Sequence, residues 1–453
     1  MAMGKHQARQ QSLFIATEQL SQSAGHPFYQ RLNALLGEAG FDRWVEQRCQ
    51  PHYQQNEPRG RKSIPPGVYF RMLFVGYFEG IDSQRGIAWR CADSLALRRF
   101  LNVPLDQSTP DHSTLTNTRK RLPPEVFTEV FQFVVQIANE KKLLTGKTVG
   151  VDSTTLEANA AMKSIVRKDT GEDWQDYVTR LMREEGVLEP GREPTAEEVR
   201  RFDKKRKNKK VSNQEWQSAT DDEARITKMK DGTTHLAYKA EHVVDLDSDI
   251  VLAAEIHPAD QADTATLIDS VASAQVNLEQ AGSDAQIEEV AADKGYHAAE
   301  TLDECHELEM RTYIPEPKRP HASTWTDKPK SHQQAVLNNR RRTRRDKSKA
   351  LQRRRSEVVE RTFAHICNTG GARRSWLRGL VNVTKRYLMA AAAHNLGRIL
   401  RRLFGIGKPK AAAGAVGLAA LAQLLIASLW NWIASWVELC HRETPIRLPN
   451  VAA

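Results

Sequence analysis

Apolar residues recur at helical spacing through residues 1–145. In the segments 68–75 and 126–137 they lie three and four positions apart, as a helix with one buried face requires. Proline residues precede the first segment, where they fit the start of a helix. We therefore expect a helical N-terminal domain.

A short basic helix is predicted within this domain. Asp111 is a natural N-cap, and the helix that follows it ends in Arg119, Lys120 and Arg121. Several short helices with one basic end suit a DNA-binding module. The pattern fits equally well with a solvated basic face on an ordinary all-α domain.

The hydrophobic period changes to that of a strand at residues 147–156, where Asp152 ends the apolar run. A turn-like stretch, 245–249, joins the next two predicted strands, and Asp293 follows a later one. The further strands are 235–244, 250–256, 286–292 and 311–315, with helices at 262–280 and 298–309. This order predicts a mixed sheet covered by helices, an α+β or α/β domain over residues 146–403, with carboxylates at strand ends where ligands usually bind.

A charged stretch interrupts this domain. Residues 161–210 lose strand character, contain several glycines and prolines, and end in a basic run that includes Lys204, Lys205, Arg206 and Lys207. We interpret residues 161–232 as an insertion whose basic run contacts DNA. Such runs are also common in disordered, merely solvated segments.

A second basic run leads into an amphipathic helix. It covers residues 328–355 and includes Arg340, Arg341, Arg342, Arg344, Arg345 and Arg355. The helix that follows has Val359, Phe363 and Ile366 on one face, which leaves Glu357 and Glu360 together on another. Arg361 lies beside them. A further amphipathic helix covers 388–403, and residues 404–453 form an apolar, helical tail of unknown role.

Composition makes a polyanion the expected partner. The chain has 453 residues, a net charge of +10 and a pI near 9.3. Its five widely spaced cysteines show no metal or disulfide pattern, and the N-terminus lacks the apolar core of a signal peptide. These features predict reduced thiols and a cytoplasmic, nucleoid-associated protein.

One segment allows a different interpretation. Residues 411–437 contain no charged side chain and are long enough to span a bilayer. Polar residues and glycines dilute the run, so a packing helix or a loosely ordered tail is the preferred prediction. A protein anchored to a membrane by this segment is kept as an alternative for the whole chain.

Two aspartates near strand ends and a helical glutamate, in a chain rich in Lys and Arg, match the needs of metal-dependent phosphodiester chemistry. Mg²⁺ prefers carboxylate and phosphate oxygens, and two ions about 4 Å apart stabilise both the attacking and the leaving oxygen. Asp152 could instead end a strand by bonding nearby backbone, and Asp293 could be a turn former. Side-chain pattern alone does not choose between Glu357 and Glu360.

Three acidic motifs resemble those of the DDE-type transposases of bacterial insertion sequences. They are Gly150–Thr154, Ala292–Tyr296 and Val358–Phe363. The stretch 64–122, especially Pro110–Leu115, is similar to the InsH-type N-terminal domain of the same proteins. The resemblance implies a ribonuclease-H-like catalytic domain, with Asp152, Asp293 and Glu360 as catalytic, metal-binding triad.

The resemblance also implies the cofactors and partners. We expect two Mg²⁺ ions, with Mn²⁺ accepted, double-stranded DNA at element ends and target, a homodimer on DNA, and no small-molecule substrate. The chain departs from the family pattern near Glu360, where Ser356 and Cys367 occupy positions that often carry basic residues. Arg355, Arg361, Arg373 or Arg374 could substitute for them.

The predicted function is that of a transposase that binds terminal inverted repeats and performs metal-dependent cleavage and strand transfer. The alternative is a catalytically decayed DNA-binding protein that acts as a repressor or an architectural factor.

Overall fold

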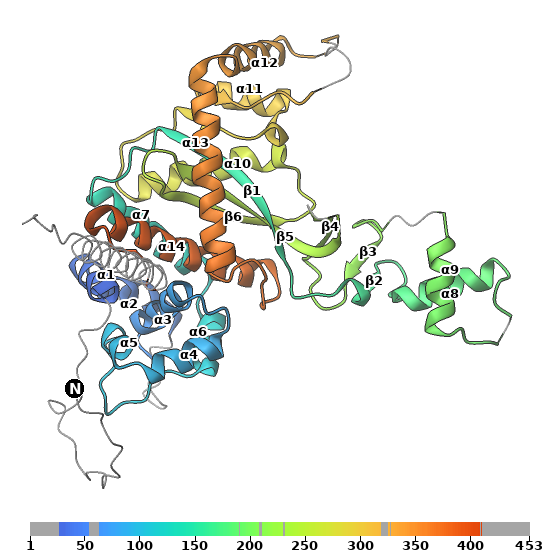
Figure 1. Cartoon of the computed structure of the whole chain (residues 1–453), viewed down its shortest axis with the longest axis horizontal. Coiled ribbons are helices and arrows are strands. Elements are labelled where there is room, and N and C mark those ends of the chain that lie inside the picture. The colour runs from blue at the N-terminus through green and yellow to red at the C-terminus, as the bar shows by residue number, and fades with distance from the viewer. Residues whose placement is uncertain are drawn as a thin grey trace, which may run out of the picture.

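A computed structural model describes residues 27–53, 63–189, 191–207, 211–229, 232–318, 325–326, 328–407 and 409. Within these ranges the chain forms a helical N-terminal part, a central mixed sheet with its covering helices, and a projecting helical lobe (Figure 1).

The N-terminal part is helical, as the apolar spacing predicted. Local signals set several helix ends: Ser83, Ser94 and Asp111 each cap a helix by accepting a backbone N–H bond, and Gly80 ends another in the left-handed conformation. The helices are α1 (Pro27–Glu38), α2 (Phe41–Cys49), the 3₁₀ turn η2 (Gln50–His52), α3 (Pro66–Glu79), α4 (Gln84–Asp93), α5 (Leu95–Phe100), α6 (His112–Arg121) and α7 (Pro124–Glu140).

The central sheet has six strands and is mixed, as predicted. Strand β5 pairs with β1 on one side and with β4 and β6 on the other, always antiparallel, whereas β1, β7 and β8 run parallel to one another. The strands are β1 (Thr148–Glu157), β4 (Arg225–Lys228), β5 (Thr234–Asp245), β6 (Val251–Pro258), β7 (Glu289–Ala291) and β8 (Arg311–Tyr313). The pattern did not predict the short strand β4.

Helices cover both faces of the sheet. Gly150 faces α13 and Ser153 faces the first residue of α10, and side chains an odd number of positions apart on a strand point to opposite faces. Helix α13 crosses the sheet in the front of Figure 1. The helices of this part are α10 (Asp263–Gln280), the 3₁₀ turn η4 (Lys294–Tyr296), α11 (Ala299–Glu307), α12 (Lys330–Thr343), α13 (Asp346–Phe363), the π-helical η5 (Ala364–Thr369) and α14 (Leu380–Phe404).

The charged insertion is a helical hairpin on a short β stalk. The 3₁₀ turn η3 (Met162–Ser164) and strands β2 (Ile165–Arg167) and β3 (Trp216–Ser218) form the stalk, and α8 (Trp174–Glu184) and α9 (Ala196–Lys205) form the lobe. The lobe has a small hydrophobic cluster of its own, made by Val178, Met182, Leu188 and Val199. Figure 1 shows it projecting from the sheet.

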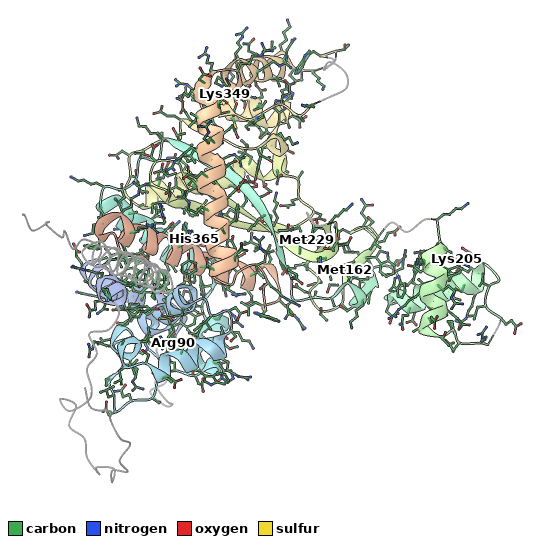
Figure 2. All side chains as sticks on the ribbon, in the orientation of Figure 1. Arg90, Met162, Lys205, Met229, Lys349 and His365 are labelled. Carbon is green, nitrogen blue, oxygen red and sulfur yellow. The ribbon has the colours of Figure 1, made fainter. Side chains whose placement is uncertain are left out.

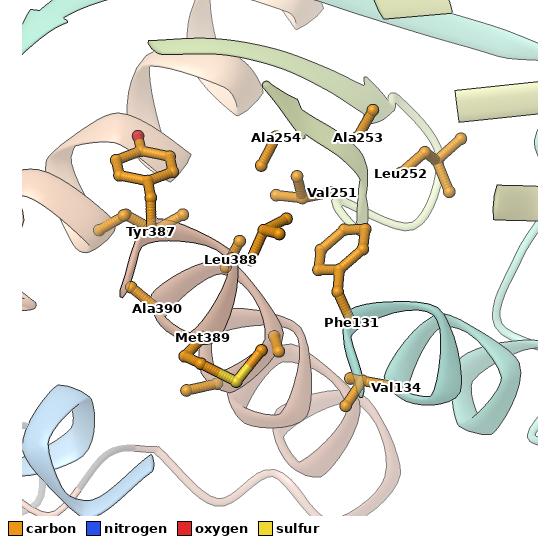
Figure 3. Packing of buried hydrophobic residues seen from close by; sticks show 14 of the residues in the cluster. Phe131, Val134, Val251, Leu252, Ala253, Ala254, Tyr387, Leu388, Met389 and Ala390 are labelled. Atoms are coloured by element: carbon orange, nitrogen blue, oxygen red, sulfur yellow. The ribbon is translucent and has the colours of Figure 1, made fainter. Parts of the chain in front are cut away.

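One hydrophobic core joins the N-terminal helices to the sheet. Helix α7 packs on α14 and on α10, and α3 also packs on α14. Figure 3 shows Phe131 and Val134 of α7, residues 251–254 of β6 and residues 387–390 of α14 in one cluster. The core is therefore continuous across the predicted domain boundary at residue 145.

Other predictions concern the cysteines and the apolar segment. Cys49, Cys91, Cys305 and Cys367 are buried free thiols. Among the residues placed in the structure, no helix is long and apolar enough to cross a bilayer. Residues 411–437, like most of the predicted 404–453 tail and Cys440, lie outside the described ranges.

Candidate active site

Asp152 and Asp293 are carried by neighbouring parallel strands. The ladder between β1 and β7 ends with Gly150 opposite Ala291, so two residues later each chain carries one of the aspartates. Burial raises the pKa of Asp152, and the nearby charge of Asp293 raises it further, against the lowering effect of Arg355. The two carboxylates are therefore close enough for the charge of Asp293 to affect the pKa of Asp152.

Asp152 does not end its strand, contrary to the prediction. Strand β1 continues to Glu157 through its antiparallel ladder with β5, and only the parallel ladder with β7 stops before Asp152. The carboxylate therefore lies at the opening between β1 and β7. Asp293 lies beyond the end of β7, where its Oδ1 accepts a 2.6 Å bond from the backbone N–H of Gly295.

An arginine on α13 pairs with Asp152. The Nη1 of Arg355 donates to Oδ2 of Asp152 at 2.7 Å, and the backbone N–H of Ser153 donates to Oδ1 at 2.8 Å. The side chain of Arg355 is 9% exposed and that of Asp152 is 22% exposed. The guanidinium of Arg355 is thus the counter-ion of Asp152.

Gly150 allows α13 to lie close to the strand that carries Asp152. A Cβ at this position would lie 2.7 Å from Leu246 Cδ2, 3.0 Å from Val359 Cγ2 and 3.1 Å from Arg355 Cγ. Such contacts are too short for any larger residue without displacement of the helix or its side chains. Glycine here sets the spacing between α13 and Asp152.

The two glutamates of α13 have different surroundings. Glu357 pairs with Arg361 and lies 3.6 Å from Arg354 Nη1. Glu360 is exposed, and no hydrogen bond or ion pair joins it to another described residue. Glu357 is engaged by arginines, whereas Glu360 keeps its carboxylate available.

Helical spacing relates Glu360 to the aspartates. Gln352, Ser356 and Glu360 follow one another at intervals of four residues and so form a row along α13. Gln352 Nε2 donates to the carbonyl of Ala292, next to Asp293, and Ser356 Oγ accepts from Arg355. Glu360 is the next member of this row, but across the described ranges no three acidic, His or Cys side chains converge closely enough to hold a metal ion.

A third aspartate lies beside Asp293. Asp263, the first residue of α10, accepts from Ser153 Oγ at 2.9 Å and from Lys239 Nζ at 3.3 Å. A Cβ on Gly295 would lie 2.9 Å from Asp263 Oδ2 and 2.9 Å from Asp293 Oδ1. Sequence analysis did not single out Asp263, for which the start of the predicted helix 262–280 was the one signal.

A buried polar network supports this side of the site. Glu241 is fully buried, and burial raises the pKa of its carboxyl. Its Oε2 accepts from Thr266 Oγ1 at 2.9 Å and from the Tyr296 hydroxyl at 2.8 Å, while Lys239 Nζ donates to Thr266 Oγ1. The network joins β5, α10 and the turn after Asp293.

Arg373 lies on the same strand face as Asp152. Its Nη1 donates to Thr154 Oγ1 at 3.0 Å and to the carbonyl of Thr155 at 3.3 Å. Cys367 is buried and contacts the Tyr387 hydroxyl, so it does not stand at the surface in place of a basic residue. Arg355 and Arg373 therefore both donate to side chains on this face of β1.

The predicted DNA contacts divide into exposed and engaged side chains. The engaged ones form bonds within the protein: Arg206 pairs with Asp203, Arg340 with Glu316, Arg342 with Thr312, Arg355 with Asp152 and Arg361 with Glu357. Arg119 belongs to neither group, because it is half-buried. The exposed ones are Lys120, Arg121, Lys204, Lys205, Lys207, Arg341, Arg344 and Arg345.

The exposed cations lie on separate parts of the molecule. Lys205 marks the projecting lobe and Lys349 the start of α13 at another extremity, while the N-terminal helices form a third (Figure 2). In the lobe, several arginines are paired with glutamates of the same helices or of the connection between them, as in Arg201 with Glu197 and Arg183 with Glu193. Its positive charge is therefore largely balanced, except at the end of α9.

Two family models match this chain. A model described as a transposase domain (DUF772) matches residues 16–121, and a model described as a transposase DDE domain matches residues 198–396. The second range contains Asp293 and Glu360, while Asp152 lies between the two ranges. A search of curated proteins finds no match to the chain.

Proposed function

The chain belongs to the DDE-type insertion-sequence transposases, and we propose that it binds the terminal inverted repeats of its element and catalyses cleavage and strand transfer. The family implies a nuclease and transesterase activity that depends on divalent metal ions. The observation that carries the proposal is the placement of Asp152 and Asp293 on adjacent parallel strands, beneath the helix that bears Glu360.

We assign Asp152, Asp293 and Glu360 as the acidic triad. Glu360 is preferred to Glu357 because Glu357 is already neutralised by Arg354 and Arg361. Asp263 acts as a positioning residue, since its carboxylate contacts Ser153 beside Asp152 and borders Asp293 at Gly295.

We propose that these acidic residues bind two Mg²⁺ ions, with Mn²⁺ as a substitute. Their donors are hard carboxylate oxygens, and the raised pKa of Asp152 reflects burial and repulsion that a cation would relieve. When bound, the ions supply an activated nucleophile, first water and then the freed 3′-hydroxyl, and stabilise the leaving oxygen. Asp152 and Asp293 hold their carboxylates at the opening between β1 and β7. Arg355 would balance the charge of Asp152 until the metal ions bind.

The exposed cations contact DNA phosphates. Arg341, Arg344 and Arg345 at the end of α12, Lys120 and Arg121 on α6, and the end of α9 would bind separate stretches of duplex around the acids. Affinity from such contacts falls steeply as salt rises. The protein acts as a homodimer on DNA within the nucleoid.

The test uses a supercoiled donor plasmid that carries the element ends, incubated with the protein and Mg²⁺ or Mn²⁺. Wild-type protein should cut at the element ends, and Asp152→Asn, Asp293→Asn and Glu360→Gln should bind the ends without cutting. Glu357→Gln, on the same helix, is the matched control and should retain cleavage. Equal cleavage by Asp152→Asn would refute the triad, and salt-dependent binding by wild-type protein with no nicking would favour a DNA-binding repressor instead.

A further inference from the structure

A cavity of about 310 Å³ lies between the N-terminal helices and the C-terminal part of the catalytic domain. Helices α3, α4 and α6 form one wall, and the segment 370–377 with α14 forms the other. Asp82 and Ser83 are exposed, and Trp376 is half-exposed, so the cavity opens to solvent beside them.

Three cations that form no ion pair with a described carboxylate line this cavity: Arg119, Lys385 and Arg386. Nε and Nη1 of Arg119 are buried, and no hydrogen-bond partner for them exists among the described residues. Lys385 Nζ donates to the carbonyls of Leu122 at 2.7 Å and Arg119 at 3.2 Å. The guanidinium of Arg386 donates to the carbonyls of Gly371 and Arg374.

The charge of these groups is only partly balanced. Burial lowers the pKa of Arg119, Lys385 and Arg386, while the charge of Glu125 partly offsets this effect at Lys385 and that of Asp82 partly offsets it at Arg386. Asp82 is the carboxylate that lines the cavity, and its Oδ2 accepts a 2.9 Å bond from Trp376 Nε1. A buried cation is costly unless it is paired, so this excess of positive charge favours an anionic ligand.

The remaining wall is apolar and larger than a simple anion needs. Leu73, Ile87, Phe127 and Met389 line it together with aromatic rings. Cavities of this size with an apolar lining and a few convergent polar groups hold small organic ligands. A ligand that fills it would carry both an anionic group and a ring.

We propose that this cavity is a binding site for a nucleotide, with the phosphate at its cationic side, beside Arg119, Lys385 and Arg386, and the base and sugar against the apolar wall. The nucleotide could come from a DNA strand or from a free nucleoside phosphate, and both sources share this chemistry. The site is separate from the acidic residues and is distinct from the proposed catalytic function.

The position of the cavity gives a bound nucleotide a structural consequence. Its wall includes Gly370 and Trp376, which follow the helix that carries Glu360. Between them, Arg373 binds Thr154 and Thr155 on the strand of Asp152. A ligand there would tie the N-terminal helices to the segment that braces the catalytic strand.

Binding is measured by isothermal titration calorimetry on the full chain. The protein carries Asp152→Asn and the buffer contains EDTA, so that the result is independent of catalysis. The probes are dAMP, inorganic phosphate and a short single-stranded oligonucleotide. Arg119→Met should weaken dAMP binding about tenfold or more through loss of charged hydrogen bonds. Arg43→Met, an exposed arginine on α2, is the matched control and should leave it unchanged.

A second variant fills the space without changing charge. Ala390→Phe places a ring in the cavity from α14 and should abolish dAMP binding, with a circular dichroism spectrum like that of wild-type protein. Oligonucleotide that displaces dAMP identifies a DNA strand as the source, and dAMP binding without displacement identifies a free nucleotide. The proposal is overturned if dAMP does not bind, if phosphate binds as tightly as dAMP, or if both cavity variants bind like wild type.

Discussion

His242 is expected to make the folded protein sensitive to acid. It lies on β5 directly opposite Asp152, is fully buried, and stacks on Phe363 with ring centroids 4.0 Å apart. Its Nδ1 lies 2.8 Å from Thr362 Oγ1, and its Nε2 lies 2.9 Å from the Tyr387 hydroxyl. The ring therefore links strand β5 to both α13 and α14, beside the candidate active site.

A neutral ring satisfies these contacts. Thr362 Oγ1 already donates its proton to the carbonyl of Val359, so it accepts from Nδ1–H of His242. In the neutral ring Nε2 then accepts from the Tyr387 hydroxyl. Burial accordingly lowers the pKa of His242 to about 3.

The magnitude follows from proton linkage. A histidine in the unfolded chain has a pKa near 6.5, so it binds a proton below that pH. In the folded protein His242 stays unprotonated down to about pH 3. The contribution of the neutral ring is complete above about pH 6.5 and is lost as pH falls, at about 1.4 kcal/mol per pH unit. Between about pH 6.5 and pH 5 the free energy of unfolding should drop by roughly 2 kcal/mol from this group.

The assay is urea unfolding, followed by tryptophan fluorescence, at a series of pH values from about 7 to about 5. His242→Gln should be less stable than wild type at neutral pH, and the difference should shrink by roughly 2 kcal/mol at the acid end. His306→Gln, which removes an exposed histidine of α11, is the control and should keep the wild-type pH dependence. An unchanged difference between wild type and His242→Gln across this range would refute the buried neutral imidazole.

Three further predictions concern charged contacts. Arg355→Gln frees Asp152 from its counter-ion, so Mn²⁺ affinity measured without DNA should rise about tenfold or more, and an equal or weaker affinity would contradict the pairing. Asp249→Ala leaves a cluster of part-buried arginines without their shared carboxylate, so urea unfolding should show a loss of about 3 kcal/mol; a loss below about 1 kcal/mol would count against the cluster. Arg341→Ala should weaken DNA binding and reduce the slope of log affinity against log salt concentration by about one. Arg342→Ala removes bonds to Thr312 and should instead lower the free energy of unfolding by about 1–3 kcal/mol. The reverse pattern would refute the assignment.

Local rules in the sequence determined the elements and their order. The N-cap at Asp111, where the side chain accepts from Thr114 N–H at 2.7 Å, depends only on neighbouring residues, as does the turn at 245–249 between β5 and β6. Apolar periodicity predicted the helical N-terminal part and the mixed sheet because each helix or strand must bury one face. The order of motifs predicted the three acids through a family resemblance.

Contacts between distant residues were decided only by the tertiary structure. Asp152 and Arg355 are 203 positions apart, and their pairing depends on how α13 crosses β1 over Gly150. Whether Asp152 ended its strand depended on the ladder with β5, which has no signal within residues 147–156.

The resemblance favoured Glu360, and the structure adds side-chain contacts within α13 that distinguish it from Glu357. Both glutamates lie on the exposed side of α13, and the arginines that engage Glu357 were visible in sequence only as part of a basic run. The proximity of Asp263 to Asp293 likewise arises because α10 begins where the chain turns after β7. Periodicity reports which face of an element is buried, but the partner of a polar side chain depends on the packing of elements far apart in the chain.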